Sequence, residues 1–554
     1  MPPAPPDIDA ETAADPHPPT QQELGVRIQK AGATVLVPHL IIKFAGLFAN
    51  WFIPNHYGKA VAETFKVIND SVLNVAFLFG EQCLAPAYLP LFTRAREEGG
   101  EARAWRFTSI LFNLQLLVLL VLVSIFMLFP EWFVRLLTEW AGSSDPELVE
   151  RHRLFLVMLP FAAPGLLGMS LASLTYVVLN GYKEFFFAAF GDALLKLSIL
   201  GGAAIGYFIK NDDWRFLAGG AVFGGTLKLA THLFALGWKR MRKHTWTLDA
   251  TDKYVKMFGL LILPLLAGVA ISQGRDVVIT RALTSQANLK LFYGNGRTVV
   301  DSIQFIIPYT LSIALLPFFC DLSAREDNAR LGAVLTQSIR ILVWFLVPVG
   351  IAIAAAALPV SSVLYEGAKY TKSDVGYTAH VSSLYAAQLP FAALEMMVMQ
   401  AFFSSKRVIT PTIVGLVFSA LSAGTAYVGV KNGLVTTPWA ILTLVALAAI
   451  FSRILKSLVL VAFLRRSVPV LPVIETLGYV LRVALAGAAA GAAAYAVSKL
   501  NLGGSKPAKL VLSGVIAAVT FAVFLGASLA LRLEEPKQFL RWTREKLNRR
   551  GKKK

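Results

Sequence analysis

Charged side chains inside long apolar stretches are the residues of this chain whose chemistry needs explaining. A charge at bilayer depth costs about 3 kcal/mol on insertion scales, so it normally faces protein or a water-filled cavity. Because these charges are unevenly spread along the chain, we expect them to line a shared polar cavity. In the first half they are Lys43, Lys66, Asp70, Glu81, Asp192, Lys196 and Lys228, and in the second half Arg275, Asp276, Arg281, Arg297, Asp301 and Glu395.

Motifs for catalysis or ATP hydrolysis do not occur in the sequence. It has no Gly-x-x-x-x-Gly-Lys-Ser/Thr loop and no Ser/His/Asp or His/Glu cluster with hydrolase spacing. Cys83 and Cys320 have neither metal-ligand nor redox spacing. We therefore expect neither an enzyme nor a bound cofactor. Any energy that the chain uses would then come from a coupling cation, the membrane potential or the downhill passage of a substrate.

Several of the charges also have a purely structural interpretation. Lys66 and Asp70 are four residues apart, and so are Asp192 and Lys196, so each couple could pair on one helix face. Lys43 could extend to the membrane interface instead of facing the cavity. For each of these residues the sequence leaves both interpretations open.

The composition describes a membrane protein that crosses the bilayer many times. Of its 554 residues, 56% are hydrophobic and 16% charged, and the mean hydropathy is +0.59. Soluble domains carry about 25% charged residues. The net charge of +19 comes from Lys and Arg clustered between apolar runs, which favours basic cytoplasmic loops over a nucleic-acid partner.

Fourteen apolar segments predict fourteen spanning helices, since a span needs about 20 mostly apolar residues. The segments are approximately 31–53, 64–92, 105–129, 153–179, 185–209, 216–238, 255–282, 290–319, 337–363, 377–403, 409–430, 437–463, 474–498 and 508–531. Basic residues cluster in alternate connections and in the tail. By the positive-inside rule, both termini are expected in the cytoplasm.

An internal repeat divides these helices into two lobes. Leu159-Pro160-Phe161-Ala162-Ala163 recurs as Leu389-Pro390-Phe391-Ala392-Ala393, and Leu89-Pro90 recurs as Leu316-Pro317 at nearly the same separation. Six predicted helices separate each pair, which predicts two parallel six-helix lobes with a polar cavity between them. The predicted parts are a disordered tail (1–30), the N-lobe (31–238), the C-lobe (239–463), two final helices (464–531) and a basic cytoplasmic tail (532–554).

Four stretches stand out by their order and spacing: Phe79-Gly80-Glu81 continuing through Ala87-Tyr88-Leu89-Pro90, Ile279-Thr280-Arg281-Ala282-Leu283-Thr284-Ser285, Tyr293 through Arg297, and Ala314-Leu315-Leu316-Pro317. Together they resemble the MurJ (MviN) lipid II flippases of the multidrug/oligosaccharidyl-lipid/polysaccharide exporter superfamily. The six-six-two helix layout is also that of the family.

The resemblance implies a flippase that moves the undecaprenyl-diphosphate-linked peptidoglycan precursor between leaflets of the bacterial inner membrane. Arg281 and Arg297 match cavity arginines of the family, which would bind the diphosphate. Glu81 matches the acidic residue of the second span, and Glu63 stands where the family has Asp. Asp70 and Asp301 are expected to gate the cavity or balance its charge. The last two helices would hold the polyprenyl tail.

The chain departs from the family pattern in its first two helices. Phe44-Ala45-Gly46-Leu47 replaces the family's Phe-Ala-Arg-Asp, and Val75-Ala76 occupies the stretch of its paired arginines. We therefore expect a less cationic first half, with Lys43 as a substitute point charge. Export of another lipid-linked polysaccharide, cation-coupled drug export, and a non-transporting scaffold that recruits cell-wall enzymes are the alternatives.

Overall fold

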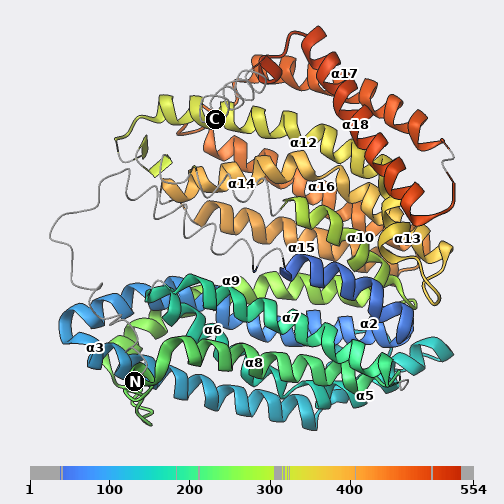
Figure 1. Cartoon of the computed structure of the whole chain (residues 1–554). Coiled ribbons are helices and arrows are strands. Elements are labelled where there is room, and N and C mark those ends of the chain that lie inside the picture. The colour runs from blue at the N-terminus through green and yellow to red at the C-terminus, as the bar shows by residue number, and fades with distance from the viewer. Residues whose placement is uncertain are drawn as a thin grey trace, which may run out of the picture.

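The computed structural model describes residues 41–182, 184–209, 212–304, 325–405, 409–500 and 503–537, together with residues 38, 315, 319, 320, 322, 323 and 407. Its regular structure is helical throughout these residues, which confirms the all-α membrane class. The helices form two lobes that lie one above the other (Figure 1).

The N-lobe contains the first part of the chain. Its elements are a helix over 41–56, α2 (Lys59–Ile68), the π-helical turn η2 (Asn69–Leu73), α3 (Asn74–Leu128), α4 (Pro130–Leu137), α5 (Pro146–Ala162), α6 (Gly165–Gly181), α7 (Phe185–Phe208) and α8 (Trp214–Met241). Helices α6, α7 and α8 contact one another closely, and α3 packs against α6. Within α3 the backbone breaks at Gly99 and Gly100, where Gly100 has φ of 66°. Glycine tolerates this left-handed conformation, so the chain turns back between two predicted spans.

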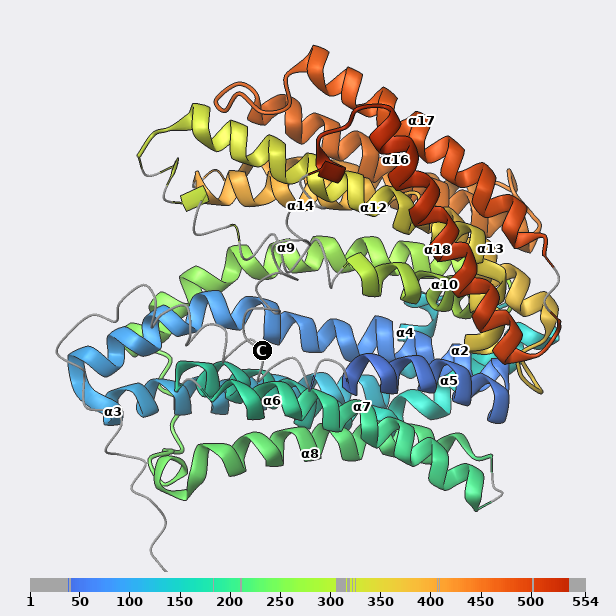
Figure 2. The same cartoon turned by 45° about the horizontal axis from the view of Figure 1, so that its top comes forward.

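The C-lobe and the final helices follow. They are α9 (Lys253–Leu283), α10 (Leu289–Gln304), α12 (Asn328–Tyr365), α13 (Lys372–Ala386), α14 (Leu389–Ser404), α15 (Ile409–Lys431), α16 (Pro438–Leu464), α17 (Val473–Ser498) and α18 (Lys506–Ala530). Helix α9 runs between the lobes and contacts α3 on one side and α15 on the other. Helices α17 and α18 pack against α12 on the outer flank of the C-lobe (Figure 2).

The two copies of the repeated pentapeptide both lie at bends. Helices α5 and α6 meet at 51° just after 159–163, and α13 and α14 meet at 47° just before 389–393. Pro160 lies inside α5, where it removes a backbone hydrogen bond and favours a kink, whereas Pro390 lies in the first turn of α14, where a new helix segment can begin with proline. Each bent pair coincides with one predicted span, the fourth and the tenth.

The described part of the chain contains eight helices that are long and apolar enough to cross a membrane, or ten if each bent pair is one span. Helix is present in every range predicted to span. The first and eighth ranges extend into residues outside the described part, and the predicted tail 1–30 and residues 538–554 of the predicted basic tail (532–554) lie outside it. The count of fourteen therefore remains a prediction, and so do the lobe boundaries.

Candidate functional site

A polar pocket lies in the N-lobe, where the helix over 41–56 approaches α2, η2 and α7. Its polar lining is Asn50, Lys66, Asn69, Asp70 and Lys196, and the rest is small or apolar. The pocket also reaches the C-lobe, through Leu291 of α10. We call these five polar residues, together with Lys290 beside Leu291, the lysine pocket.

Lysines outnumber acids in the lysine pocket. Lys66 Nζ lies 3.5 Å from Asp70 Oδ2, and Asn69 Nδ2 donates to Asp70 Oδ1 at 2.9 Å. Lys196 and Lys290 also interact electrostatically with Asp70. Among the residues that line the pocket, Asp70 is the one acid, and it lies within electrostatic range of three ammonium groups. Lys196 also interacts with Asp192 outside the lining, and Lys290 with Asp276. This excess of positive charge suits an anionic ligand.

Local backbone geometry places these groups. The π-helical turn Asn69–Leu73 widens the helix directly after α2, and such turns are frequent at functional sites. Lys66 reaches across to α10, where a Cβ on Gly294 would lie 2.1 Å from Lys66 Cε. The absence of a side chain at Gly294 thus admits Lys66 between the lobes.

Arg297 carries positive charge on the C-lobe side of the lobe interface. Its Nη2 lies 3.3 Å from Asp301 Oδ2, and its guanidinium lies over the rings of Tyr293 and Tyr385, 5.5 and 5.3 Å from their centroids. Arg297 Nε is buried and has no hydrogen-bond partner within the described part of the chain. Lys290, on the same helix as Arg297, is attracted by Asp70 and repelled by Arg297, so it lies within electrostatic range of both.

A second cationic cluster lies deeper in the C-lobe. Glu395 Oε1 lies 2.6 Å from Lys456 Nζ, and its Oε2 lies 3.3 Å from Arg453 Nε. Arg453 also donates to Gln304 Oε1 at 2.9 Å. Arg275 of α9 interacts electrostatically with Glu395. Again, one carboxylate is shared by more than one cation.

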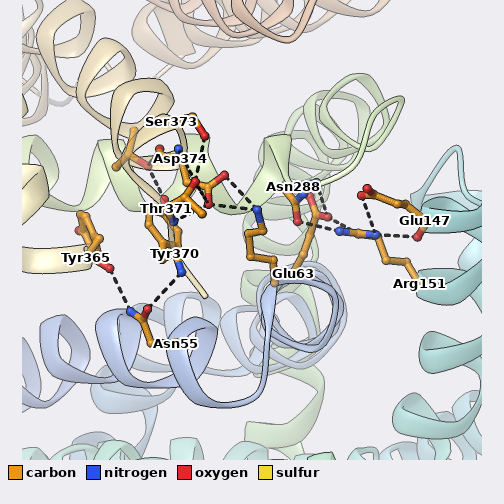
Figure 3. A network of polar contacts seen from close by, with 12 residues as sticks. Asn55, Glu63, Glu147, Arg151, Asn288, Tyr365, Tyr370, Thr371, Ser373 and Asp374 are labelled. Atoms are coloured by element: carbon orange, nitrogen blue, oxygen red, sulfur yellow. Dashed lines mark hydrogen bonds and ion pairs between the residues drawn. The ribbon is translucent and has the colours of Figure 1, made fainter. Parts of the chain in front are cut away.

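A different kind of polar contact holds the lobes together near one end of the molecule (Figure 3). Glu63 of α2 is fully buried and pairs with Arg151 of α5 at 2.6 Å. It also accepts from the backbone N–H groups of Asn288 and Lys290 in the C-lobe, at 2.7 and 3.0 Å. Arg151 Nη2 donates to Asn288 Oδ1 at 2.6 Å. Asn288 has φ of 69°, a left-handed value that asparagine tolerates.

Further contacts between the lobes surround this buried pair. Lys59 Nζ lies 3.0 Å from Asp374 Oδ2, which also caps α13 together with Thr371. Asn55 Nδ2 donates to Tyr365 O at 2.9 Å, and Asn55 Oδ1 accepts from Tyr370 N at 3.2 Å. Together with Glu139–Arg281, described next, we call these contacts the latch. Its members are Asn55, Lys59, Glu63, Glu139, Arg151, Arg281, Asn288, Tyr365, Tyr370 and Asp374.

The structure separates the predicted site residues. Asp70 lies in the lysine pocket, and Arg297 with Asp301 lies on the opposing α10. Arg281, in the last turn of α9, instead pairs with Glu139 of the N-lobe at 2.6 Å and therefore belongs to the latch, as Glu63 does.

Two predicted residues lie elsewhere. Lys43 is half-buried on the helix over 41–56, one turn before Gly46 and two before Asn50. Gly46 and Asn50 line the pocket, so Lys43 occupies the same helix face. Glu81 lies within α3, and its side chain is outside the described part of the structure.

Sequence analysis did not single out Lys290, Arg453, Lys456 or Arg151. Lys290 opens a predicted span and Arg151 precedes one, positions at which a charge is ordinary. Arg453 and Lys456 lie three residues apart in the apolar run of α16. Charges inside a span are rare, so this pair could have been singled out from the sequence as a buried polar site. The lysines of α2 and α7 also make the first half more cationic than its missing arginines suggested.

The fold and the site define a transporter with two helical lobes and a polar, cation-rich lobe interface. The sequence model of the family described as lipid II flippase MurJ matches residues 57–514. The chain therefore belongs to the MurJ family, which confirms the resemblance, and it is a multi-span membrane protein of a bacterial inner-membrane family.

Individual relatives agree with this assignment. A probable lipid II flippase MurJ of Bdellovibrio bacteriovorus is 24% identical over 463 residues, covering 81% of this chain and 84% of that protein. The lipid II flippase MurJ of Thermosipho africanus is 23% identical over 383 residues, covering 68% and 74%. A solved MurJ structure in an inward closed conformation matches with a TM-score of 0.70 at 19% identity, covering 90% of this chain and 98% of that one. An inward-facing multidrug transporter of the MATE family matches with a TM-score of 0.63 at 12% identity, covering 79% of this chain and 97% of that one.

Proposed function

We propose that this protein moves lipid II, the undecaprenyl-diphosphate-linked peptidoglycan precursor, from the inner to the outer leaflet of the bacterial inner membrane. The observation that carries this proposal is the excess of cations at the lobe interface of a MurJ family member. Lys66, Lys196 and Lys290 provide three ammonium groups around one carboxylate, Asp70. A diphosphate brings the negative charge that this arrangement lacks.

Arg297 completes the diphosphate site from the C-lobe side. Its unpaired Nε provides a donor, and charge-assisted hydrogen bonds from guanidinium to phosphate are short and strong. Asp70 and Asp301 hold the cations in place between transport cycles and balance part of their charge. Lys43 lies on the helix over 41–56, toward one end of the lysine pocket. There it attracts the headgroup as the lipid enters. Glu81 remains a proposed gating residue of α3.

The latch closes one end of this site. Connections near the latch contain acids such as Glu139 and Glu147, whereas Arg94, Arg96 and Lys243 lie in connections at the other end. By the positive-inside rule, we assign the latch to the outer side and both termini to the cytoplasm. Transport then requires the latch to open while the other end closes, which is alternating access. Either a coupling cation or the membrane potential would drive this cycle.

The final helices provide a place for the lipid tail. An apolar cleft between α12 and α18 is lined by Trp344, Phe345, Pro348 and Phe524, among others. A polyprenyl chain fits such a lining because it offers no polar groups. Cell-wall synthesis proteins that use lipid II on the outer side are the expected protein partners.

Translocation in proteoliposomes tests the proposal. The purified chain is reconstituted with lipid II, and the fraction reaching the outer leaflet is measured by an impermeant enzyme that modifies exposed headgroups. We expect faster translocation than in protein-free vesicles and a loss of that gain in Arg297→Gln. Equal rates with and without protein would refute the proposal. Faster movement of a different lipid-linked glycan than of lipid II would favour the alternative exporter.

A further inference from the structure

A buried polar cluster in the N-lobe has no part in the function described so far. Lys228 and His232 of α8 have no exposed surface, although they lie one turn apart in a spanning helix. Lys228 Nζ lies 2.5 Å from Asp192 Oδ1 of α7, whose side chain is 29% exposed. A buried charge in a membrane helix is expensive, so such a cluster calls for a function.

Helix α7 is shaped to admit this cluster. A Cβ on Gly191 would lie 2.5 Å from His232 Nε2 and 3.0 Å from Lys228 Cγ. Any side chain at position 191 would therefore displace the imidazole and the lysine stem.

The imidazole of His232 has partners for both of its protonation states. Its Nε2 lies 3.2 Å from Ala188 O, and its Nδ1 lies 3.1 Å from Ala172 O and 3.0 Å from Thr175 Oγ1. Carbonyl oxygens only accept, so imidazolium can donate from both nitrogens. Neutral imidazole can donate from Nε2 while Nδ1 accepts from the Thr175 hydroxyl, which can donate to either neighbour. A proton can thus be gained or lost without leaving a buried polar atom unsatisfied.

The charges around His232 connect it to the lysine pocket. Lys228 on its own helix, Asp192 on α7 and the Tyr176 phenol on α6 face it. Lys196, one turn along α7 from Asp192, interacts electrostatically with Asp192, Lys228 and Asp70. Added positive charge at His232 therefore acts electrostatically on the lysine pocket, where the diphosphate would bind.

We propose that Asp192, Lys228 and His232 form a proton-binding site that couples proton uptake to diphosphate binding in the lysine pocket. This inference rests on the proposed transport function and names its coupling ion. One proton from cavity water, entering past the partly exposed Asp192, forms an N–H bond at His232 Nδ1 and later returns to water. The Asp192 carboxylate, which already pairs with Lys228, offsets part of the added charge, and the Thr175 hydroxyl donates to Ala172 O. Because coupling is reciprocal, a bound diphosphate also favours the proton.

Proton uptake on lipid binding tests the coupling directly. Undecaprenyl diphosphate is added to the purified chain in weakly buffered detergent, and the pH change is followed with a dye. We expect net uptake in the wild-type chain and its loss in His232→Asn. The control is His380→Asn, a half-buried histidine whose Nε2 contacts Thr443 Oγ1 in the C-lobe at 2.7 Å, and it should retain the uptake. Uptake that persists unchanged in His232→Asn, or binding without uptake in the wild type, would overturn the proposal.

A second measurement does not depend on the lipid. In histidine-labelled protein, the His232 resonance should shift with pH as the imidazole gains and loses a proton, within the pH range over which the protein stays folded. A His232 that keeps one protonation state throughout this range would rule out the proton site, even if transport itself were confirmed. Conversely, titration of His232 without any lipid II translocation would refute the transport function while leaving the proton site intact.

Discussion

The latch and the lysine pocket both place charged side chains between the same two lobes, yet their charges are organised in opposite ways. In the latch each acid has its own cationic or backbone donors, with Glu63 meeting Arg151, Asp374 meeting Lys59 and Glu139 meeting Arg281. In the lysine pocket Asp70 is shared by three lysines. Matched charges favour one fixed arrangement of the lobes, whereas an unmatched excess favours a charged ligand.

The charged side chains of the latch are also more deeply buried than those of the lysine pocket. Glu63 and Arg151 are 0% and 2% exposed, whereas Lys66 and Asp70 are 18% and 36% exposed. The buried pair specifies how the lobes meet and is costly to break on one side only. The partly exposed pocket keeps its lysines accessible to a ligand at lower cost. The comparison therefore predicts stability effects at the latch and binding effects at the pocket.

Removal of the buried arginine should have the largest effect. Arg151→Met leaves the Glu63 carboxylate buried without its cation, at a cost of about 3–5 kcal/mol. We expect a clearly lower melting temperature of the purified protein in detergent. Adding Glu63→Gln to Arg151→Met removes the stranded charge and should recover much of the loss. A single variant that melts like the wild type would show that the pair does not hold the lobes.

Lys59→Met should weaken the latch less. Asp374 is 6% exposed in its side chain and keeps its contacts to Thr371, so we expect a loss of about 1.5 kcal/mol for the charged hydrogen bond. A cysteine placed at Ser373 should then react faster with a water-soluble maleimide from the outer side. Lys537→Met, which breaks the exposed pair with Glu534, is the control and should change neither value.

Gly294→Ala addresses the pocket from the opposing lobe. The new Cβ would clash with Lys66, so the ammonium must move away from Asp70. We expect roughly fivefold weaker binding of undecaprenyl diphosphate, about 1 kcal/mol, with a small change in melting temperature. Gly259→Ala, where a Cβ would meet nothing within 4 Å, provides the matched control. Unchanged binding in Gly294→Ala would mean that the position of Lys66 does not matter.

Substitution of Glu366 should have the smallest effect on stability, and that effect should depend on pH. It follows α12, and hydrogen bonds from Lys509 and Ser362 lower the pKa of its carboxyl. A lowered pKa in the folded state means that the stabilisation is present at neutral pH and is lost as the pH falls through that lowered value. Glu366→Gln should therefore cost about 0.5 kcal/mol at pH 7. The difference from the wild type should disappear in acid, and a constant difference across pH would contradict this explanation.

The helices were more predictable than the contacts between them. Apolar runs predicted the positions of the spans, because a backbone in lipid must satisfy its hydrogen bonds internally. The repeated pentapeptide marked the two bent spans. The spacing of Lys66 and Asp70 predicted a pair that the structure contains. Asp192 instead has Lys228 of the next helix as its direct partner, because the approach of α7 and α8 decides between candidates that spacing alone cannot separate.

The latch could not be predicted from the sequence. Lys59 and Asp374 are 315 residues apart, and their contact depends on how two lobes meet. Arg281 matched the family pattern for a cavity arginine, but the last turn of α9 brings it to Glu139 instead. Lys290 lies beside the pocket because α10 begins at Leu289, directly after Asn288 of the latch. These placements follow from lobe packing, which local sequence patterns do not encode.

Binding of undecaprenyl diphosphate to two matched variants tests the central claim most directly. Native mass spectrometry would compare the wild type with the pocket variant Lys66→Met/Lys196→Met, which loses two lysine charges, and with the latch variant Lys59→Met, which loses one. The pocket variant should bind at least about tenfold more weakly, as expected for lost charge-assisted hydrogen bonds, while the latch variant binds like the wild type. Equal binding by the wild type and the pocket variant would contradict the account.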